Sequence, residues 1–331
     1  MVPSGLTDPM APDLTMSTDE IEAVRRAGPS RRSRATNRIL RLGAPLLLPH
    51  RFDAATLTRS RRRFELIGHL SPPVAGMATS FGELAGRPAR WDRPTADSDE
   101  HGVILYLHGG AYIMGSPTSG AELAQGMALA TGRTVIGLDY RMATEDRFPA
   151  WVDDAEAAFS ALAETHGAER VMVAGDSAGG GLTLALLLRL KSVGAPQPAA
   201  AMAFSPWTDI LGRGDSARIN DGSDPTLSPY WLRSVGATIV VDSGADPDDP
   251  ELSPALGDYS GCAPVLLQVG DIEILLDDAR SIRDAYERAG IDHTYSEWPG
   301  AGHVFTAQWR LMPEARAALA EVGRFVRRHS H

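Results

Sequence analysis

The chain has 331 residues, of which 43% are hydrophobic and 22% are charged, with a single cysteine and a formal net charge of −10. These proportions are those of an ordinary globular protein, and they exclude collagen, coiled coil and a largely disordered chain. One cysteine cannot form an intramolecular disulfide or a multi-cysteine zinc site, and the acidic balance gives nucleic acid no overall electrostatic reason to bind.

The N-terminal zone, residues 1–75, holds twelve arginines between Arg25 and Arg63. Ser17 followed by Glu20 is typical of a capping box, so we expect a short helix to begin there. A basic run of this kind is most often a solvated face, and a membrane-surface or acidic-partner role is the alternative. No early stretch is long and apolar enough to cross a bilayer, so we expect no stable membrane insertion and a cytoplasmic location.

From residue 76 onward, short apolar runs alternate with helix-like segments. The apolar runs are 103–107, 134–138, 171–174, 200–204 and 265–269. The helix-like segments are 121–130, 151–164, 178–192, 276–289 and 313–328. Such short runs fit strands that are buried on both faces of a parallel sheet. The alternation therefore predicts βαβ units in a doubly wound α/β domain over residues 76–331.

This alternation is interrupted at about 205–262, where aspartates and prolines accumulate around a helix candidate at 230–235. The acidic cluster near Asp246 lacks the fixed alternation and the closing glutamate of an EF-hand calcium loop. We therefore interpret the segment as an insertion with solvated loops.

The pentapeptide Gly175-Asp176-Ser177-Ala178-Gly179 stands between a predicted strand and a predicted helix. That context is the one a nucleophile elbow needs, because the serine takes strained backbone angles that point its Oγ out of the turn. A phosphate-binding turn is the alternative, but no Lys-Ser/Thr pair or ribose-binding acid is in register. Ser177 is therefore the predicted nucleophile, and the N–H of Ala178 is a predicted oxyanion donor.

A second motif, His108-Gly109-Gly110, directly follows the strand at 103–107. Two glycines there let a backbone loop approach a substrate carbonyl and direct N–H groups at its oxygen. We expect Gly109 and Gly110 to supply these donors and His108 to order the loop.

A serine nucleophile needs a base and an acid that orients the base, in the chain order serine, acid, histidine. His303 lies in a loop between a strand at 294–298 and the last helix, so it is the predicted base. Asp271 and Glu273 both stand at the carboxyl end of the strand 265–269, and the pattern alone leaves either as the acid. Asp277 and Asp278 fall in the first turn of the next helix, where we expect them to interact with its dipole.

Together these motifs resemble those of the bacterial hormone-sensitive-lipase-like esterases of the α/β-hydrolase fold, over about residues 101–326. The motifs that carry the resemblance are His-Gly-Gly-Ala-Tyr (108–112), Asp-Tyr-Arg (139–141), Phe-Pro-Ala (148–150), Gly-Asp-Ser-Ala-Gly-Gly (175–180), Ser-Pro-Trp-Thr-Asp (205–209) and Gly-His-Val-Phe (302–305). The resemblance implies a mostly parallel central sheet flanked by helices. It also implies a helical cap, formed by residues 1–75 and by the insertion at 205–262.

The resemblance also bears on the acid. Where the family often reads Asp-Pro-Leu, this chain reads Glu-Ile-Leu from Glu273. Matching without a gap from Pro264 puts Glu273 on the acid position and leaves Asp271 as the alternative. Ala111 stands where the family usually has a third glycine, and Ala111 and Tyr112 are implied to contact the substrate.

The implied activity is a serine carboxylesterase that hydrolyses short- to medium-chain acyl esters through an acyl-enzyme, with no cofactor and no metal. A lactone hydrolase of the monoterpene or caprolactone type and an amidase are alternatives on the same triad. A ligand-binding receptor on this scaffold is the non-enzyme alternative, since some relatives have lost the histidine and serve as receptors. The number of subunits is left open, with a homodimer among the options.

Overall fold

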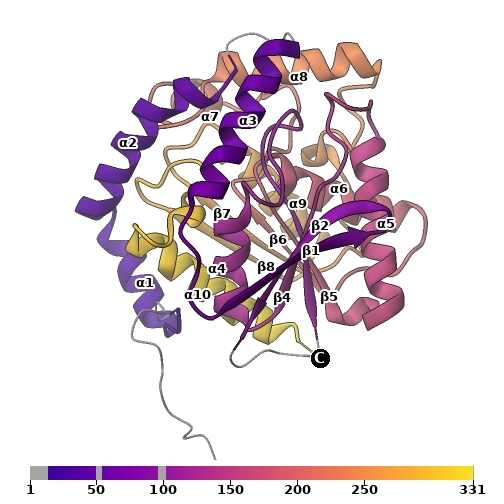
Figure 1. Ribbon diagram of the computed structural model, residues 1–331, viewed down its shortest axis with the longest axis horizontal. Helices are drawn as coiled ribbons and strands as arrows, with labels where there is room; N and C mark the ends of the chain where they lie inside the picture. Colours follow the sequence, from indigo (N-terminus) through magenta and orange to yellow (C-terminus); the bar gives the residue numbers. More distant parts are fainter. Residues whose placement is uncertain (1–13, 50–53, 96–101, 331) are drawn as a thin grey trace, which may run out of the picture.

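The computed structural model describes residues 14–49, 54–95 and 102–330, so Arg51 of the arginine-rich zone lies outside it (Figure 1). Within the described residues, eight strands form one sheet in the order β1-β2-β4-β3-β5-β6-β7-β8. The strands are β1 (Met77–Leu84), β2 (Arg87–Pro94), β3 (Val103–Leu107), β4 (Thr134–Leu138), β5 (Val171–Asp176), β6 (Ala200–Phe204), β7 (Val265–Gly270) and β8 (His293–Trp298). From β4 to β8 all neighbours are parallel, which confirms the predicted α/β fold with a mostly parallel sheet.

The antiparallel edge formed by β1 and β2 was not predicted from the sequence. All but the two end residues of β1 are exposed, and β2 mixes three arginines with two prolines. Neither strand therefore contains the continuous apolar run that identifies a buried parallel strand.

Helices cover both faces of the sheet. One face packs against α4 (Ala121–Thr131) and α10 (Pro313–Arg328), and the other against α5 (Ala150–His166), α6 (Ala178–Ser192) and α9 (Leu276–Ala289). Successive side chains of β3 point to opposite faces of the sheet, so each face has its own hydrophobic core. Ile104 and Tyr106 belong to one core, and Leu105 and Leu107 belong to the other. Because these strands are parallel, the loops that follow β3, β5, β6 and β7 all begin at the same end of the sheet, where the carboxyl ends of the strands lie.

Three helices form the described part of the N-terminal zone. They are α1 (Thr18–Ala27), α2 (Arg31–Leu47) and α3 (Ala54–Leu70), and they lie outside the helices that flank the sheet (Figure 1). The capping box of Ser17 and Glu20 is present at the start of α1, as predicted. The zone is fixed to the domain because α1 packs against α10 and the N–H of Ser30 donates to Glu314 Oε1 at 2.6 Å.

The insertion carries α7 (Ser216–Ile219), α8 (Pro229–Ser243) and the short 3₁₀ helix η2 (Pro254–Leu256). The helix candidate at 230–235 is therefore the first part of a longer helix, which begins after the N-cap residue Ser228. Two further 3₁₀ turns are η1 (Ala168–Arg170) and η3 (Phe305–Gln308). Among the helices that the structure describes, none has the length and apolarity needed to cross a membrane.

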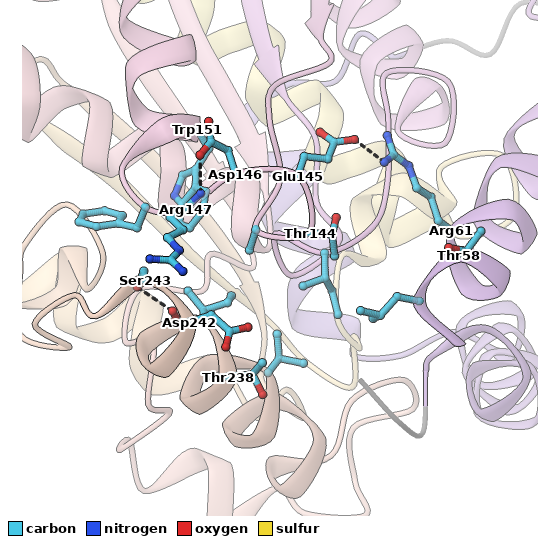
Figure 2. A pocket seen from close by; sticks show the side chains of 16 residues that line it. Thr58, Arg61, Thr144, Glu145, Asp146, Arg147, Trp151, Thr238, Asp242 and Ser243 are labelled. Atoms are coloured by element: carbon cyan, nitrogen blue, oxygen red, sulfur yellow. Dashed lines mark hydrogen bonds and ion pairs between the residues drawn. The ribbon is translucent and has the colours of Figure 1, made fainter. Parts of the chain in front are cut away.

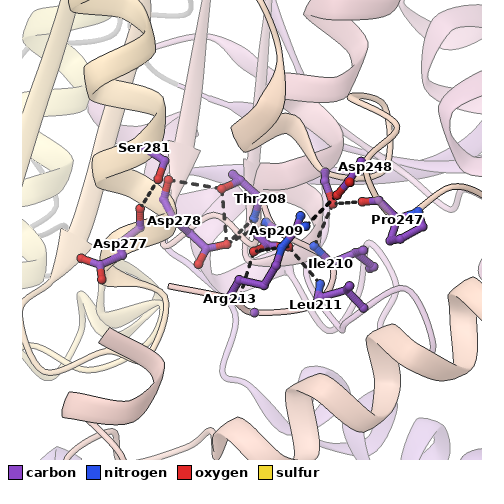
Figure 3. A network of polar contacts seen from close by, with 12 residues as sticks. Thr208, Asp209, Ile210, Leu211, Arg213, Pro247, Asp248, Asp277, Asp278 and Ser281 are labelled. Atoms are coloured by element: carbon purple, nitrogen blue, oxygen red, sulfur yellow. Dashed lines mark hydrogen bonds and ion pairs between the residues drawn. The ribbon is translucent and has the colours of Figure 1, made fainter. Parts of the chain in front are cut away.

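The two aspartates lie in the first turn of α9, as expected, and they also bind the insertion; Figure 3 shows the contacts of Asp278. Asp278 Oδ1 accepts hydrogen bonds from the N–H groups of Thr208 and Asp209 at 2.7 and 2.9 Å. Asp277 Oδ2 accepts one from the N–H of Ser216 at 2.7 Å. Burial raises the pKa of Asp278 to about 7. These carboxylates therefore tie the start of the insertion to the helix that follows β7.

Candidate active site

Ser177 occupies the turn between β5 and α6 with φ 52° and ψ −121°, a conformation that L-residues rarely adopt. The turn is also too tight for side chains at its two glycines. A Cβ on Gly175 would lie 2.1 Å from the carbonyl oxygen of Gly179, and one on Gly179 would lie 2.0 Å from that of Leu107. The local geometry is therefore that of the predicted elbow.

Three side chains that lie far apart in the sequence form one hydrogen-bonded series. Ser177 Oγ lies 2.9 Å from His303 Nε2, and His303 Nδ1 lies 3.0 Å from Glu273 Oε2. Ser177 is 8% exposed and Glu273 is fully buried. Burial alone would lower the pKa of His303, but the hydrogen bond and the negative charge of Glu273 outweigh it and hold that pKa above its usual value.

Asp271, the alternative acid, accepts its hydrogen bond from a residue other than His303. Its Oδ1 accepts a hydrogen bond from the N–H of Gly300 at 2.6 Å, within the loop that leads to His303. Asn37 of α2 donates to the carbonyl oxygen of the same Gly300 at 2.9 Å. This loop is therefore held from one side by Asp271 and from the other by the N-terminal zone.

Glu273 has further partners that the sequence analysis missed. The N–H of Gly270 and the Oγ of Ser205 donate to its Oε1 at 2.6 and 2.7 Å, and Ser205 Oγ also accepts from the N–H of Val304 at 3.0 Å. Ser205 thus bridges the carboxylate and the residue after His303. Ser205 directly follows β6, at the end of the sheet where Ser177 and Glu273 lie, and this position in the sequence could have indicated a role in the site.

The insertion also holds the loop that carries Glu273. Asn220 Nδ2 donates to the carbonyl oxygens of Asp271 and Glu273 at 3.0 and 2.7 Å, and Asp224 Oδ2 accepts from the N–H of Ile274 at 3.1 Å. Both side chains come from the segment between α7 and α8. Their contacts span about fifty residues, and no local pattern indicates them.

The loop after β3 differs from expectation at Gly109. Its N–H donates to Asp176 Oδ1 at 2.9 Å, so the predicted oxyanion role of Gly109 is not supported. The same Oδ1 accepts from the hydroxyl of Tyr106 at 2.5 Å. In the described part of the chain, the N–H groups of Gly110, Ala111 and Ala178 have no protein acceptor. The free donors therefore begin one residue later than predicted.

His108 orders this loop, as expected. Its Nδ1 lies 2.8 Å from the carbonyl oxygen of Gly109, and its ring stacks on that of Tyr140 with centroids 4.4 Å apart. Burial lowers its pKa, which favours the neutral ring. Tyr112 is 3% exposed and stacks on Trp151 at 5.1 Å between centroids, so its ring is part of the packed core.

A pocket of about 420 Å³ lies between α3, the loop at 143–148 and α8 (Figure 2). Its apolar lining consists of Leu57, Ile113, Ala143, Phe148, Trp151, Val235 and Ile239. Charged side chains also line it, and Arg61 is paired with Glu145 at 2.6 Å. Ser177 and His303 are not among its lining residues, but Ile113 belongs to the loop that bears Gly110 and Ala111.

Comparisons with known proteins identify the family of the chain. A family model described as the alpha/beta hydrolase fold matches residues 104–307. The chain is 39% identical to an acetyl-hydrolase from Streptomyces hygroscopicus, over 80% of this chain and 87% of that protein. It is 32% identical to an esterase from Acinetobacter venetianus, over 73% of this chain and 79% of that protein. It also matches the crystal structure of an esterase from the bacterial hormone-sensitive lipase family with a TM-score of 0.84 and 34% identity, over 91% of this chain and 99% of that one.

Fold and sequence thus define an α/β hydrolase. Within that class the chain belongs to the hormone-sensitive-lipase-like esterases, which confirms the resemblance found in its motifs. It is a carboxylic ester hydrolase that acts on small-molecule esters. This result sets aside the hypothesis of a receptor without activity.

Proposed function

We propose that the protein is a serine carboxylesterase that hydrolyses short- to medium-chain acyl esters through an acyl-enzyme. The observation that carries the proposal is the series Ser177–His303–Glu273, with distances of 2.9 and 3.0 Å between consecutive polar atoms. Each distance is within the reach of a hydrogen bond. The series supplies a nucleophile, a base and a group that orients the base.

In the acylation step, His303 Nε2 takes the proton of Ser177 Oγ while that oxygen attacks the ester carbonyl carbon. The proton then passes from Nε2 to the alkoxide leaving group, the carbon–oxygen bond breaks, and the acyl group stays on Ser177. In deacylation, water loses a proton to Nε2 and attacks the acyl carbon, and Ser177 leaves with that proton. Glu273 accepts a hydrogen bond from Nδ1–H throughout, which fixes the tautomer and stabilises the imidazolium.

The tetrahedral intermediate carries a negative oxygen that needs fixed donors. We assign this role to the N–H groups of Gly110 and Ala178, with Ala111 as the third. The assignment is supported by their lack of acceptors within the described residues. Ala178 also begins α6, where the helix dipole favours negative charge.

The preference for short and medium acyl chains is supported by the pocket of Figure 2. Its volume of about 420 Å³ falls within the range of small-molecule sites. An acyl chain that extended beyond the apolar wall would have to displace water from Arg61 and Glu145 without replacing its hydrogen bonds. The name of the acetyl-hydrolase relative agrees with a small acyl group.

We further propose that residues 1–75 and 205–262 act as the cap. The support is that both contribute to the same pocket, through Leu57, Thr58 and Arg61 of α3 and through Val235 and Ile239 of α8. Thr238→Phe, which places a phenyl ring in the pocket lining, should therefore shift the preference toward acetate. The same replacement at Val241, which is 78% exposed on the same helix, should leave the preference unchanged.

The experiment is a series of p-nitrophenyl esters from acetate to laurate, compared with a lactone panel and with p-nitroanilides. We expect kcat/KM to be highest between acetate and octanoate, and Ser177→Ala to lose about 10⁴-fold or more in turnover. A higher kcat/KM on a lactone or an anilide would assign the enzyme to that class instead. An unchanged rate in Ser177→Ala would reject the serine mechanism.

A further inference from the structure

We propose that the outer face of α2 and α3 binds the surface of an anionic phospholipid bilayer. The face, called here the basic face, joins exposed apolar side chains with exposed arginines. Its apolar members are Ile39, Leu42, Leu46 and Leu66, and its basic members are Arg31, Arg32, Arg38, Arg59 and Arg62. This inference does not depend on the mechanism proposed above.

Three of the apolar side chains form a stripe along α2. Ile39, Leu42 and Leu46 are 68%, 76% and 66% exposed, and their spacing places them on one side of α2. Leu66 is 57% exposed on α3, which contacts α2. Arg63 joins the two helices by donating to the carbonyl oxygen of Leu46 at 2.6 Å. Large side chains gathered on one surface in this way mark a site of interaction.

The arginines surround that stripe. At 3.6 residues per turn, Arg31, Arg32 and Arg38 fall with the stripe within about 120° of the α2 circumference. On α3, Arg59 and Arg62 fall on either side of Leu66. In the part of the chain that the structure describes, these five arginines have no ion pair.

The charge of these helices is opposite to that of the whole protein. Helices α2 and α3 hold nine arginines and one glutamate, so they carry +8. The net charge of the chain is −10, and the remaining residues therefore carry −18. This separation would orient the molecule with the basic face toward a negative surface.

The combination of exposed apolar side chains with unpaired arginines favours a lipid surface over a second copy of the chain as the binding partner. Two copies that met through this face would bring unpaired arginines against arginines, at an electrostatic cost. An anionic bilayer satisfies both components, because its headgroups bind the arginines while the apolar side chains enter the headgroup boundary. Since no described helix could cross a membrane, the predicted binding is peripheral.

The helix α3 that carries part of the basic face also walls the pocket. Leu57 and Arg61 line the pocket about 140–180° around α3 from Leu66, and Thr58 lines it about 80° from Leu66. Adsorption through the basic face would therefore place the helix that walls the pocket at the lipid surface.

The test is co-sedimentation of the full chain with vesicles, either of phosphatidylcholine alone or of phosphatidylcholine mixed with phosphatidylglycerol. We expect binding to the mixed vesicles, at least about tenfold weaker binding to pure phosphatidylcholine, and loss of binding in high salt. Equal binding to the two kinds of vesicle, or no binding to either, would overturn the proposal.

Two sets of variants test the face itself, with circular dichroism and ester hydrolysis as checks of folding. One set removes the apolar stripe, and the other removes three basic charges. The substitutions are Ile39→Gln, Leu42→Gln and Leu46→Gln in the first set, and Arg31→Gln, Arg38→Gln and Arg62→Gln in the second. Each set should weaken binding to the mixed vesicles by about tenfold or more.

Matched controls carry the same replacements at exposed residues elsewhere. They are Val193→Gln, Leu256→Gln and Leu311→Gln for the stripe, and Arg170→Gln, Arg288→Gln and Arg324→Gln for the charges. Both control sets should bind as the wild type does. An equal loss in a control set would overturn the proposal, and so would sedimentation velocity showing that the stripe variant converts a dimer to a monomer.

Discussion

Ser205 Oγ donates a hydrogen bond to Glu273 Oε1 at 2.7 Å and accepts one from the N–H of Val304 at 3.0 Å. One hydroxyl therefore connects the carboxylate to the backbone beside His303. Ser205 has φ 46°, so the residue is held in an uncommon conformation that directs its side chain between the two loops. We interpret Ser205 as a positioning residue.

Replacing Ser205 by alanine should lower kcat by about tenfold or more with little change in KM, because the geometry of His303 and Glu273 loosens while the pocket is unchanged. Steady-state kinetics on p-nitrophenyl acetate measures this split. Ser296→Ala is the control, since Ser296 is also buried but binds Glu321 instead. If both variants lose only stability and keep kcat, Ser205 has no positioning role.

Asp176→Ala should impair the oxyanion loop. The substitution leaves the hydroxyl of Tyr106 and the N–H of Gly109 without their shared acceptor, so the loop that bears Gly110 is no longer fixed. We expect kcat to fall by about 10- to 100-fold. Asp176→Asn keeps an oxygen for both donors and should retain most of the activity. Equal losses in the two variants would show that the charge, rather than the acceptor, matters.

The two carboxylates near His303 should differ strongly in their contribution to turnover. Glu273→Gln should lose about 10²- to 10⁴-fold, because an amide there no longer enforces the tautomer that Ser177 needs. Asp271→Asn should lose less than about tenfold, since its oxygen can still accept from the N–H of Gly300. The reverse order would make Asp271 the acid.

The dependence of kcat/KM on pH provides a second measure of the same pair. His303 acts as a base only when it is neutral, and the carboxylate of Glu273 holds its pKa above the usual value. Activity should therefore fall as the pH drops through that raised pKa, and in Glu273→Gln the fall should move to lower pH. An acid limb that stays in place would separate Glu273 from the titration of His303.

Asp278 should make the stability of the protein depend on pH. Its pKa in the folded state is about 7, above the ordinary 3.8, so the folded protein binds the proton more tightly than the unfolded chain does. The stability from this group is therefore complete below about pH 4 and is lost as the pH rises toward 7. From pH 5 to pH 8 the wild type should lose about 3 kcal/mol more of its unfolding free energy than Asp278→Asn. Parallel denaturation curves for the two proteins would contradict this account.

The sequence predicted those features that have a local pattern. The apolar runs identified β3 to β7, and the spacing around Ser177 indicated a strand, a turn and a helix. The sheet edge was missed because β1 is exposed and lacks an apolar run. The N–H of Gly109 could not be assigned either, since its direction depends on Asp176, which lies 67 residues away.

The identity of the triad acid could not be predicted from local sequence either. Asp271 and Glu273 are two residues apart at the end of one strand, and only the path of the loop turns one toward Gly300 and the other toward His303. The partners of Asp278 lie about seventy residues away in the insertion, so its position in the first turn of a helix indicated an interaction with the dipole but not these hydrogen bonds. Long-range contacts of this kind leave no trace in local spacing.

Labelling with a fluorophosphonate followed by peptide mass spectrometry shows whether Ser177 forms the covalent intermediate. We expect one adduct per chain, on the peptide that contains Ser177, and strongly slowed labelling in His303→Ala because the base is missing. Ser177→Ala should take up no label and should lose about 10⁴-fold or more in turnover. Label on another serine, or full turnover in Ser177→Ala, would show that Ser177 is not the nucleophile.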